Sequence, residues 1–293
     1  MNRSILSLII LLITTCCNYA NKSFDFNGKI ALVTGGARGN GYAIISELLQ
    51  KGVRGVTMID VNAQRGQQAA QELNKKYGYG KVIFIPVNIS QATQFEYAFR
   101  VSMWHWNGLD IVINNAGVVG EDNWISMVNV NIVGTVQGTY LGMQYMSKSK
   151  RGKGGVIINI SSSLGMDPAH HQPVYGASKS FILSLDRSIS DELYFNYNGI
   201  RIITVSPGAT DTQMFHNFGL SASNALNPYL KEKAIEVANY RSPQSTFSVA
   251  KGVTTVIEEG DNGGVWIIED GEQPYEICFF HRKHLQKTLT VLT

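Results

Sequence analysis

From residue 29 onward, short runs of apolar and β-branched residues alternate with longer segments in which apolar residues recur every three or four positions. Continuous apolar runs are typical of strands covered on both faces, and the longer pattern is typical of helices that bury one side. The predicted strands cover residues 29–34, 55–60, 81–86, 110–115, 155–161, 200–206 and 264–268. The predicted helices cover about 40–51, 63–77, 91–107, 124–149, 175–197 and 243–259.

This alternation predicts an α/β fold, with a doubly wound parallel sheet of seven strands of the Rossmann type in a single domain. No linker, repeat or low-complexity stretch interrupts it, so we place the domain at residues 28–270 and a tail at 271–293. The longest stretch without clear periodicity is 207–241, directly after the sixth predicted strand. Ligands bind beyond the carboxyl ends of such strands, so this stretch is predicted to cover a binding site.

The first twenty residues do not fit the alternation. Arg3 precedes an apolar run over residues 5–13, which is followed by small and polar residues. The layout is typical of a secretory signal peptide, and the run is shorter than the ~20 residues that span a bilayer. We expect cleavage after Cys17 or Ala20 and a protein in the ER lumen or secreted. An uncleaved membrane anchor and a buried N-terminal strand are the alternatives.

Composition is ordinary for a globular protein, with 44% hydrophobic residues, 16% charged residues and a net charge of +3. This weak positive balance argues against a nucleic-acid partner. Signal cleavage would leave Cys278 as the sole cysteine, which excludes an internal disulfide. The histidine spacings match no zinc pattern, so no metal is expected.

A glycine loop follows the first predicted strand. In "TGGARGNG", Gly35, Gly39 and Gly41 would permit a tight turn and let a pyrophosphate approach the start of the next helix. Asp60 ends the second strand, where an acid binds the adenosine ribose and disfavours a 2′-phosphate. Arg38 favours NADP instead, because a basic side chain there suits a phosphate. We therefore predict NAD as the cofactor, with NADP as the alternative.

Tyr175 and Lys179 stand four residues apart in "YGASK" at the start of a predicted helix. This spacing puts both side chains on one helix face. Alone, such a pair is more often a tyrosine packed on a lysine stem than a proton-transfer device. Its meaning depends on the motifs around it.

Several motifs together resemble the short-chain dehydrogenase/reductase family across residues 28–270. The matching pieces are "TGGARGNG" (34–41), "NNAG" (114–117), "NVN" (129–131), "INISSS" (158–163), "YGASK" (175–179) and "SPG" (206–208). Within the family, "GTYLGMQYMSK" (138–148) and "HQPVYGASK" (171–179) most resemble NAD-dependent 15-hydroxyprostaglandin dehydrogenases and insect alcohol-dehydrogenase-like enzymes.

The resemblance implies a catalytic tetrad. Tyr175 matches the family's base, and Lys179 the lysine that lowers the tyrosine's pKa. Ser162 matches the serine that holds the substrate oxygen, and Asn131 the asparagine of a proton relay. Gln172 matches a substrate-facing glutamine, so the implied substrate-binding residues are Ser162, Gln172 and Tyr175.

The implied cofactor site is larger. It comprises Gly35, Arg38, Gly39, Asn40, Gly41, Asp60, Asn88, Ile89, Asn115, Ala116, Gly117, Tyr175, Lys179, Pro207, Gly208, Thr210 and Thr212. Two of these depart from the family pattern. Asn40 replaces an aliphatic residue, and Asn88 replaces an aspartate that contacts adenine. The Asn88 carbonyl can still accept that hydrogen bond.

We therefore expect an NAD-dependent oxidoreductase that interconverts a secondary alcohol and a ketone on a hydrophobic small molecule, such as a prostanoid, steroid or terpenoid. The alternatives are an NADP-dependent carbonyl reductase and a secreted, non-catalytic binding protein with this fold. Apolar residues of the 207–241 stretch suit such a substrate, namely Met214, Phe215, Phe218, Leu220 and Tyr229. His170 and His171 are further candidates for the substrate mouth. A homodimer or homotetramer is expected.

Overall fold

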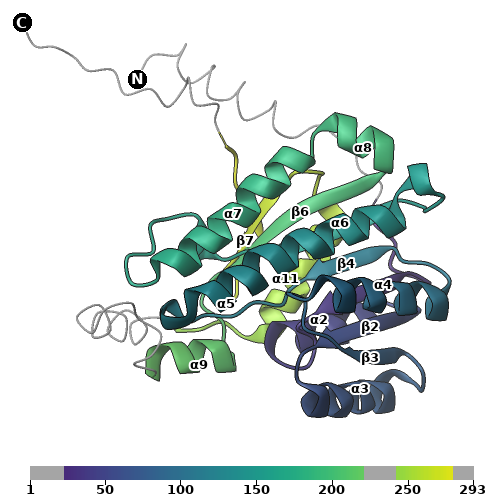
Figure 1. Ribbon diagram of the computed structural model, residues 1–293, viewed down its shortest axis with the longest axis horizontal. Coiled ribbons are helices and arrows are strands. Elements are labelled where there is room, and N and C mark those ends of the chain that lie inside the picture. Colours follow the sequence, from purple (N-terminus) through teal and green to yellow (C-terminus); the bar gives the residue numbers. More distant parts are fainter. Residues whose placement is uncertain (1–22, 221–241, 280–293) are drawn as a thin grey trace, which may run out of the picture.

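A computed structural model describes residues 23–220 and 242–279 of the chain (Figure 1). The predicted signal peptide, the C-terminal part of the 207–241 stretch (221–241) and most of the tail lie outside these residues. The side chains of Phe218, Leu220 and Tyr229 also lie outside the described part of the structure.

One eight-stranded sheet forms the centre of the molecule, in the order β3-β2-β1-β4-β5-β6-β7-β8. Its strands are β1 Ile30–Thr34, β2 Gly55–Asp60, β3 Val82–Pro86, β4 Ile111–Asn114, β5 Gly155–Ile160, β6 Ile200–Pro207, β7 Val265–Ile268 and β8 Tyr275–Glu276. The first seven are parallel, which confirms the predicted doubly wound sheet. The predicted number of seven strands is wrong because β8 pairs antiparallel with β7 inside the segment assigned to the tail. A two-residue strand is too short to have a periodic pattern.

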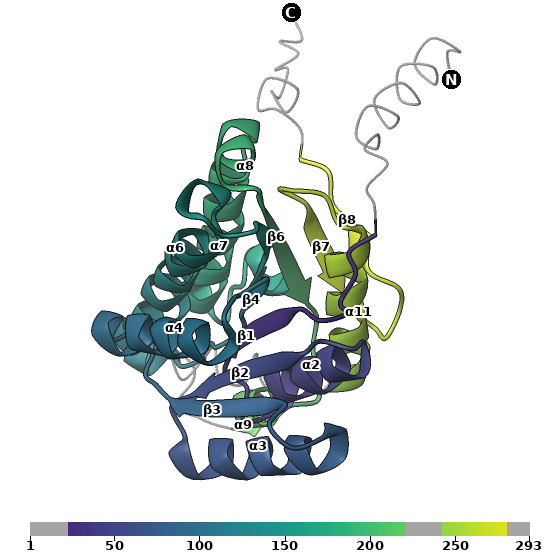
Figure 2. The same ribbon diagram turned by 90° about the vertical axis from the view of Figure 1, so that its right-hand side faces the viewer.

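Helices cover both faces of the sheet (Figure 2). They are α2 Gly39–Gln50, α3 Ala63–Tyr77, α4 Ala92–Trp106, α5 Trp124–Val128, α6 Thr135–Met146, α7 Pro173–Ile189, α8 Glu192–Asn198, α9 Gln213–Leu220 and α11 Thr246–Glu259. One buried apolar cluster packs α2, α3 and α11 on the sheet, and a second packs α4, α6 and α7 on the opposite face. These two layers are the reason why the strands read as continuous apolar runs.

Two predicted helices are interrupted. The helix expected over 124–149 is divided into α5 and α6 by a π-helical turn at Asn129–Gly134. The helix expected over 175–197 ends at Ile189, and Asp191 caps α8 by accepting a hydrogen bond from the Leu193 N–H. Within the part of the chain that the structure describes, no helix is long and apolar enough to cross a membrane.

Candidate active site

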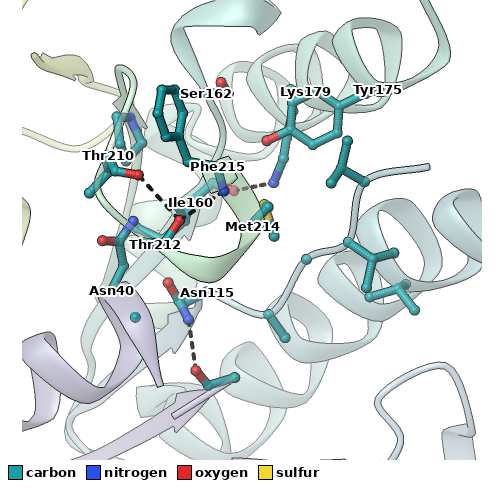
Figure 3. A pocket seen from close by; sticks show the side chains of 18 of the residues that line it. Asn40, Asn115, Ile160, Ser162, Tyr175, Lys179, Thr210, Thr212, Met214 and Phe215 are labelled. Carbon is teal, nitrogen blue, oxygen red and sulfur yellow. Dashed lines mark hydrogen bonds between the residues drawn. The ribbon is translucent and has the colours of Figure 1, made fainter. Parts of the chain in front are cut away.

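A cavity of about 530 Å³ opens at the carboxyl ends of the parallel strands (Figure 3). Nearly all of the implied cofactor-site residues line it: Gly35, Arg38, Gly39, Asn40, Asp60, Asn88, Ile89, Asn115, Ala116, Gly117, Tyr175, Lys179, Pro207, Gly208, Thr210 and Thr212. Ser162 and Gln172 line it as well. Two implied site residues, Gly41 and Asn131, lie behind the cavity wall.

The glycine loop is packed too closely for larger residues. Gly35 has a φ of +65°, and a Cβ there would lie 2.9 Å from the Ala116 Cα. A Cβ on Gly41 would lie 2.1 Å from the Gly35 carbonyl oxygen, which explains why Gly41 supports the loop from behind. Helix α2 begins at Gly39 beside the cavity. Its first N–H groups have no helical partner and therefore suit a phosphate.

Asp60 joins this loop to the second strand. Its Oδ2 accepts a hydrogen bond from the Ala37 N–H at 3.1 Å, and its Oδ1 accepts one from the Asn62 N–H at 3.0 Å. A carboxylate offers about four acceptor positions, so both oxygens can still accept from ribose hydroxyls. The residues therefore fit an adenosine ribose at this edge of the cavity.

The Asn88 amide oxygen already accepts two hydrogen bonds within the chain, which the sequence did not predict. Its Oδ1 accepts hydrogen bonds from the Ser90 N–H at 3.0 Å and from the Ser90 hydroxyl at 2.8 Å. These two bonds use both lone pairs of the amide oxygen. The expected acceptance of a hydrogen bond from adenine would have to displace one of them, and the Asn88 amide N–H₂ is the group that remains available.

Ser162, Tyr175 and Lys179 come together at the inner part of the cavity (Figure 3). Ser162 follows β5 and caps a 3-10 turn at Ser163–Gly165 by accepting from the Leu164 N–H at 3.2 Å. The Ser162 side chain interacts with the Tyr175 hydroxyl and favours its ionised form. The Lys179 Nζ lies 5.7 Å from the Tyr175 ring centroid and donates to the Ile160 carbonyl oxygen at 3.0 Å. Pro173 at the start of α7 helps to fix this register of the helix.

Burial shifts both titratable groups. The Lys179 side chain is almost fully buried, and the loss of hydration lowers its pKa to about 8. The Tyr175 residue is only partly buried, but its hydroxyl is withdrawn from water, which raises its pKa. The interaction with Ser162 partly opposes that rise. The structure therefore does not show the expected lowering of the Tyr175 pKa by Lys179, because burial dominates the shift and only Ser162 opposes it.

Asn131 lies in the π-helical turn and points at the main chain. Its Oδ1 accepts from the Val118 N–H at 2.9 Å, and its Nδ2 donates to the Val118 carbonyl at 2.9 Å and to the Ser178 hydroxyl at 3.2 Å. The side chain thus ties Val118, directly after the "NNAG" segment, to Ser178 on α7. With these bonds made, the Asn131 side chain acts as a clamp, and its expected place in a proton relay stays a prediction.

Glu121 is a site residue that the sequence analysis missed. It is completely buried, and its two oxygens accept hydrogen bonds from the Tyr175 N–H at 2.8 Å and the Val174 N–H at 3.2 Å. These N–H groups belong to the first turn of α7, where no helical partner exists. Glu121 therefore fixes the start of the helix that carries Tyr175.

Part of the cavity wall is apolar. This part is formed by Val118, Val119, Val130, Leu164, Met214 and Phe215. The buried Gln172 Nε2 has no hydrogen-bond partner among the described residues, so it is free to donate to a ligand. His171 lines the cavity, whereas His170 lies outside it.

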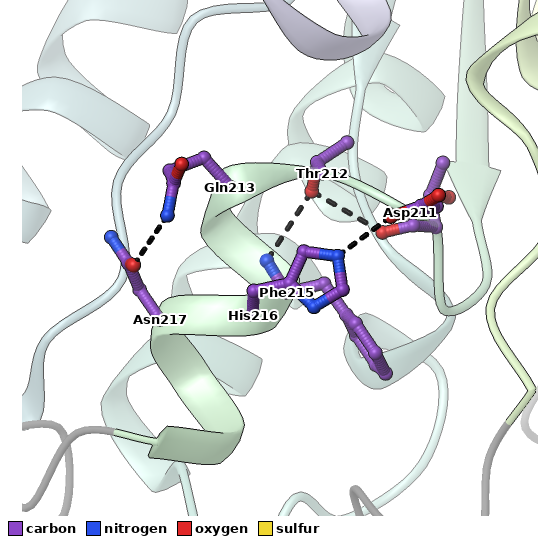
Figure 4. A network of polar contacts seen from close by, with 7 residues as sticks. Asp211, Thr212, Gln213, Phe215, His216 and Asn217 are labelled. Atoms are coloured by element: carbon purple, nitrogen blue, oxygen red, sulfur yellow. Dashed lines mark hydrogen bonds and ion pairs between the residues drawn. The ribbon is translucent and has the colours of Figure 1, made fainter.

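Helix α9 is held at the cavity by its first turn (Figure 4). The Thr212 hydroxyl donates to the Thr210 carbonyl at 3.2 Å and accepts from the Phe215 N–H at 3.3 Å. The His216 Nε2 lies 2.7 Å from the Asp211 Oδ1. These bonds place Met214 and Phe215 in the cavity wall, as expected for the segment after the sixth strand.

Comparison with known proteins agrees with this geometry. Residues 29–222 match the family model of the short chain dehydrogenases. The chain belongs to the short-chain dehydrogenase family. A 15-hydroxyprostaglandin dehydrogenase [NAD(+)] of Macaca fascicularis is 35% identical over 262 residues, which cover 88% of this chain and 98% of the relative. An alcohol dehydrogenase 2 of Ceratitis capitata is 31% identical and covers 84% of this chain and 93% of its own.

Solved structures of short-chain dehydrogenases share the fold. A short chain dehydrogenase/reductase from Burkholderia phymatum in complex with NAD matches with a TM-score of 0.71 and 18% identity, covering 84% of this chain and 90% of the other. A dehydrogenase/reductase from Sinorhizobium meliloti 1021 matches with a TM-score of 0.68 and 25% identity, covering 84% and 96%. Within residues 23–220 and 242–279, no group of His, Cys, Asp or Glu side chains is arranged to hold a metal ion.

Proposed function

We propose that this short-chain dehydrogenase uses NAD to interconvert a secondary alcohol and a ketone on a lipophilic small molecule. The observation that carries the proposal is the Ser162–Tyr175–Lys179 arrangement between a dinucleotide loop and an apolar cavity wall. The names of the relatives support NAD and an alcohol substrate. The apolar part of the cavity wall supports a substrate of the prostanoid, steroid or terpenoid kind.

The active-site residues then have different roles in the reaction. The Tyr175 oxygen takes the proton from the substrate hydroxyl, which must leave as the carbonyl forms. Ser162 donates a hydrogen bond to the same substrate oxygen and stabilises the charge that develops there. The buried Gln172 amide donates to a second polar group of the substrate. The apolar wall excludes water from the reacting carbon.

Lys179 supplies positive charge beside the base. Its pKa of about 8 leaves the ammonium form dominant at neutral pH, and only one of its three N–H groups is used by Ile160. Asp60 and the first turn of α2 would hold the adenosine and pyrophosphate portions of NAD. Bound NAD supplies the acceptor for the hydride.

The proposal predicts the outcome of Tyr175→Phe. Because the phenol is the base, we expect NADH production from a panel of lipophilic secondary alcohols to fall by roughly a thousandfold, with NADH affinity preserved. Tyr194→Phe, on the exposed helix α8, is the matched control and keeps full activity. Because the pKa of Tyr175 is raised, the native kcat/KM for oxidation should increase as the pH rises above neutrality. Native turnover by Tyr175→Phe would falsify the assignment.

A second candidate is an NADP-dependent carbonyl reductase, which is favoured by the exposed Arg38 in the cavity wall. Asp60 decides between the two cofactors because its charge repels a 2′-phosphate. We expect Asp60→Ala to weaken NADH binding and to tighten NADPH binding about tenfold. Fluorescence titration with both reduced cofactors measures this, with Asp191→Asn as a control. An unchanged ratio of the two dissociation constants would make Asp60 irrelevant to cofactor choice.

Location and assembly belong to the same proposal. We propose that residues 1–20 direct the chain into the secretory pathway, which N-terminal sequencing of the mature protein tests.

We also propose a homodimer or homotetramer. Trp124 and Ile125 on α5 and Tyr140 on α6 are exposed apolar side chains that suit a subunit contact. A monomer in sedimentation analysis at micromolar concentration would contradict this assembly.

A further inference from the structure

Helix α8 exposes an unusually apolar stripe, formed by Leu193, Tyr194 and Tyr197. Leu193 is 80% exposed, Tyr197 68% and Tyr194 45%. Leu193 and Tyr197 are four residues apart and Tyr194 and Tyr197 three apart, so the three side chains share one helix face. Leucine and tyrosine at this exposure indicate a surface that contacts something other than water.

A basic loop lies beside this stripe. Lys148, Lys150, Arg151 and Lys153 are all exposed, and in the described residues none of them forms an ion pair with a carboxylate. The Lys148 side chain packs against Gly199, the residue that caps the end of α8. The nearby acids, Asp191 and Glu192, lie at the other end of the helix. The four cations therefore outnumber the carboxylates, and they gather at one end of the stripe.

The described chain begins on the α11 side of the sheet, across the sheet from α8 (Figure 2). The Phe24 ring lies 5.8 Å from the Arg201 guanidinium, and Arg201 is the second residue of β6, directly after α8. The active-site cavity lies at the opposite ends of the strands.

We propose that the α8 stripe and the 148–153 loop dock onto an anionic phospholipid membrane surface. Leucine and tyrosine suit the headgroup boundary, where one part of the ring is apolar and the other hydrated. Lysine and arginine beside them are attracted to anionic headgroups. A second copy fits less well, because a symmetric contact would bring the same unpaired cations together. Docked in this way, the active site faces the aqueous phase.

The test compares the full-length chain with two triple variants. Lys150→Gln/Lys153→Gln/Tyr197→Ser alters the proposed surface. Lys75→Gln/Lys76→Gln/Tyr79→Ser carries the same three types of substitution at exposed positions in the last turn of α3 and just beyond it. Partition coefficients are measured with vesicles of phosphatidylcholine, with and without roughly 30 mol% phosphatidylserine.

We expect the native chain and the α3 variant to bind phosphatidylserine vesicles more tightly than neutral ones, and the difference to shrink as salt rises from roughly 0.1 to 0.5 M. The α8 variant should lose about thirtyfold in this binding, since each cation near an anionic surface contributes roughly fivefold. Equal loss in both variants, or binding independent of phosphatidylserine, overturns the proposal. Conversion of oligomer to monomer by the α8 variant alone in sedimentation also overturns it and assigns the surface to self-association. Alcohol oxidation in solution, unchanged in both variants, shows that they are folded and keeps this test separate from that of the proposed activity.

Discussion

Tyr175 is held in place through its main chain as well as its side chain. The Glu121 carboxylate binds the N–H groups of Tyr175 and Val174, while Ser162 contacts the Tyr175 hydroxyl. A carboxylate at a helix N-terminus also interacts favourably with the helix dipole. Glu121 is thus a positioning residue, which acts on the reaction only through the placement of the phenol.

The substitution Glu121→Gln tests this role. The amide keeps one acceptor oxygen but turns an N–H₂ group towards a main-chain N–H, so the first turn of α7 loses one of its two anchors. We expect kcat to fall about tenfold, because small displacements of a catalytic group are costly, while the KM for NAD changes little. A changed pH profile of kcat would distinguish displacement of Tyr175 from a general loss of stability.

Asp191→Asn is the matched control for this substitution. Asp191 caps α8 in the same manner, through the Leu193 N–H at 3.0 Å, but lies far from the cavity. The Asp191→Asn variant should have a lower free energy of unfolding but the same kcat as the native chain. If the two variants have the same kcat as the native chain, Glu121 does not position the base.

Residues with a short-range signature were predictable from the sequence. The glycine loop and Asp60 lie within one strand–helix–strand segment, and the Tyr175–Lys179 pair within one helical turn. Glu121 carries no such signature, since its partners lie 53 and 54 residues away. An isolated glutamate ordinarily indicates an exposed position, and only the assembled fold reveals it as a buried cap.

At the scale of elements, the seven parallel strands were predictable because each is a continuous apolar run. The π-helical turn was not, because the apolar periodicity continues through it. Its position depends on tertiary contacts: Asn131 is drawn to Val118 and Ser178, and a Cβ on Gly134 would lie 2.6 Å from Ile89. Such turns often occur at functional sites.

The clamp made by this turn leads to a prediction for Asn131→Ala. Loss of the side chain leaves the Val118 N–H and carbonyl without partners, which should lower the free energy of unfolding by about 2–4 kcal/mol. Turnover should also fall, because the loosened "NNAG" segment lines the cavity. Denaturant titration and steady-state kinetics measure the two effects.

The chain contains a close control for this variant. Asn74 makes the same pair of bonds to Val82, at 2.8 Å to the carbonyl and 2.9 Å from the N–H, at the start of β3. We expect Asn74→Ala to be destabilised to a similar extent with normal turnover per folded molecule. Equal kinetic damage in both variants would mean that Asn131 contributes only stability.

At the scale of the whole molecule, a buried polar network crosses the apolar interior. It joins Asn114 on β4, Thr139 on α6, Asn159 on β5, Asp186 on α7 and Thr204 on β6. Burial raises the pKa of Asp186 to about 7, although hydrogen bonds from Thr204 and Asn159 oppose the shift. The network specifies how the helices meet the sheet, at the cost of a carboxyl group that ionises unfavourably.

Stability should therefore depend on pH through Asp186. Its pKa is higher in the folded than in the unfolded chain, so its contribution is complete below about pH 4 and is lost as the pH rises to about 7. The loss amounts to at most about 4 kcal/mol. An Asp186→Asn variant cannot ionise, and it should become more stable relative to the native chain between pH 5 and pH 8 in denaturant titrations. A difference that does not vary with pH would show that Asp186 ionises normally.

The hydrogen bonds between Glu121 and α7 also affect the order in which the parts of the chain fold. Residues 35–60 can complete their loop and acid within one local unit, whereas Tyr175 waits for a contact that closes a loop of more than fifty residues. During refolding, dinucleotide binding should therefore recover before turnover. Recovery of turnover then reports the late docking of α7, and recovery of NADH fluorescence reports the earlier formation of the nucleotide-binding half.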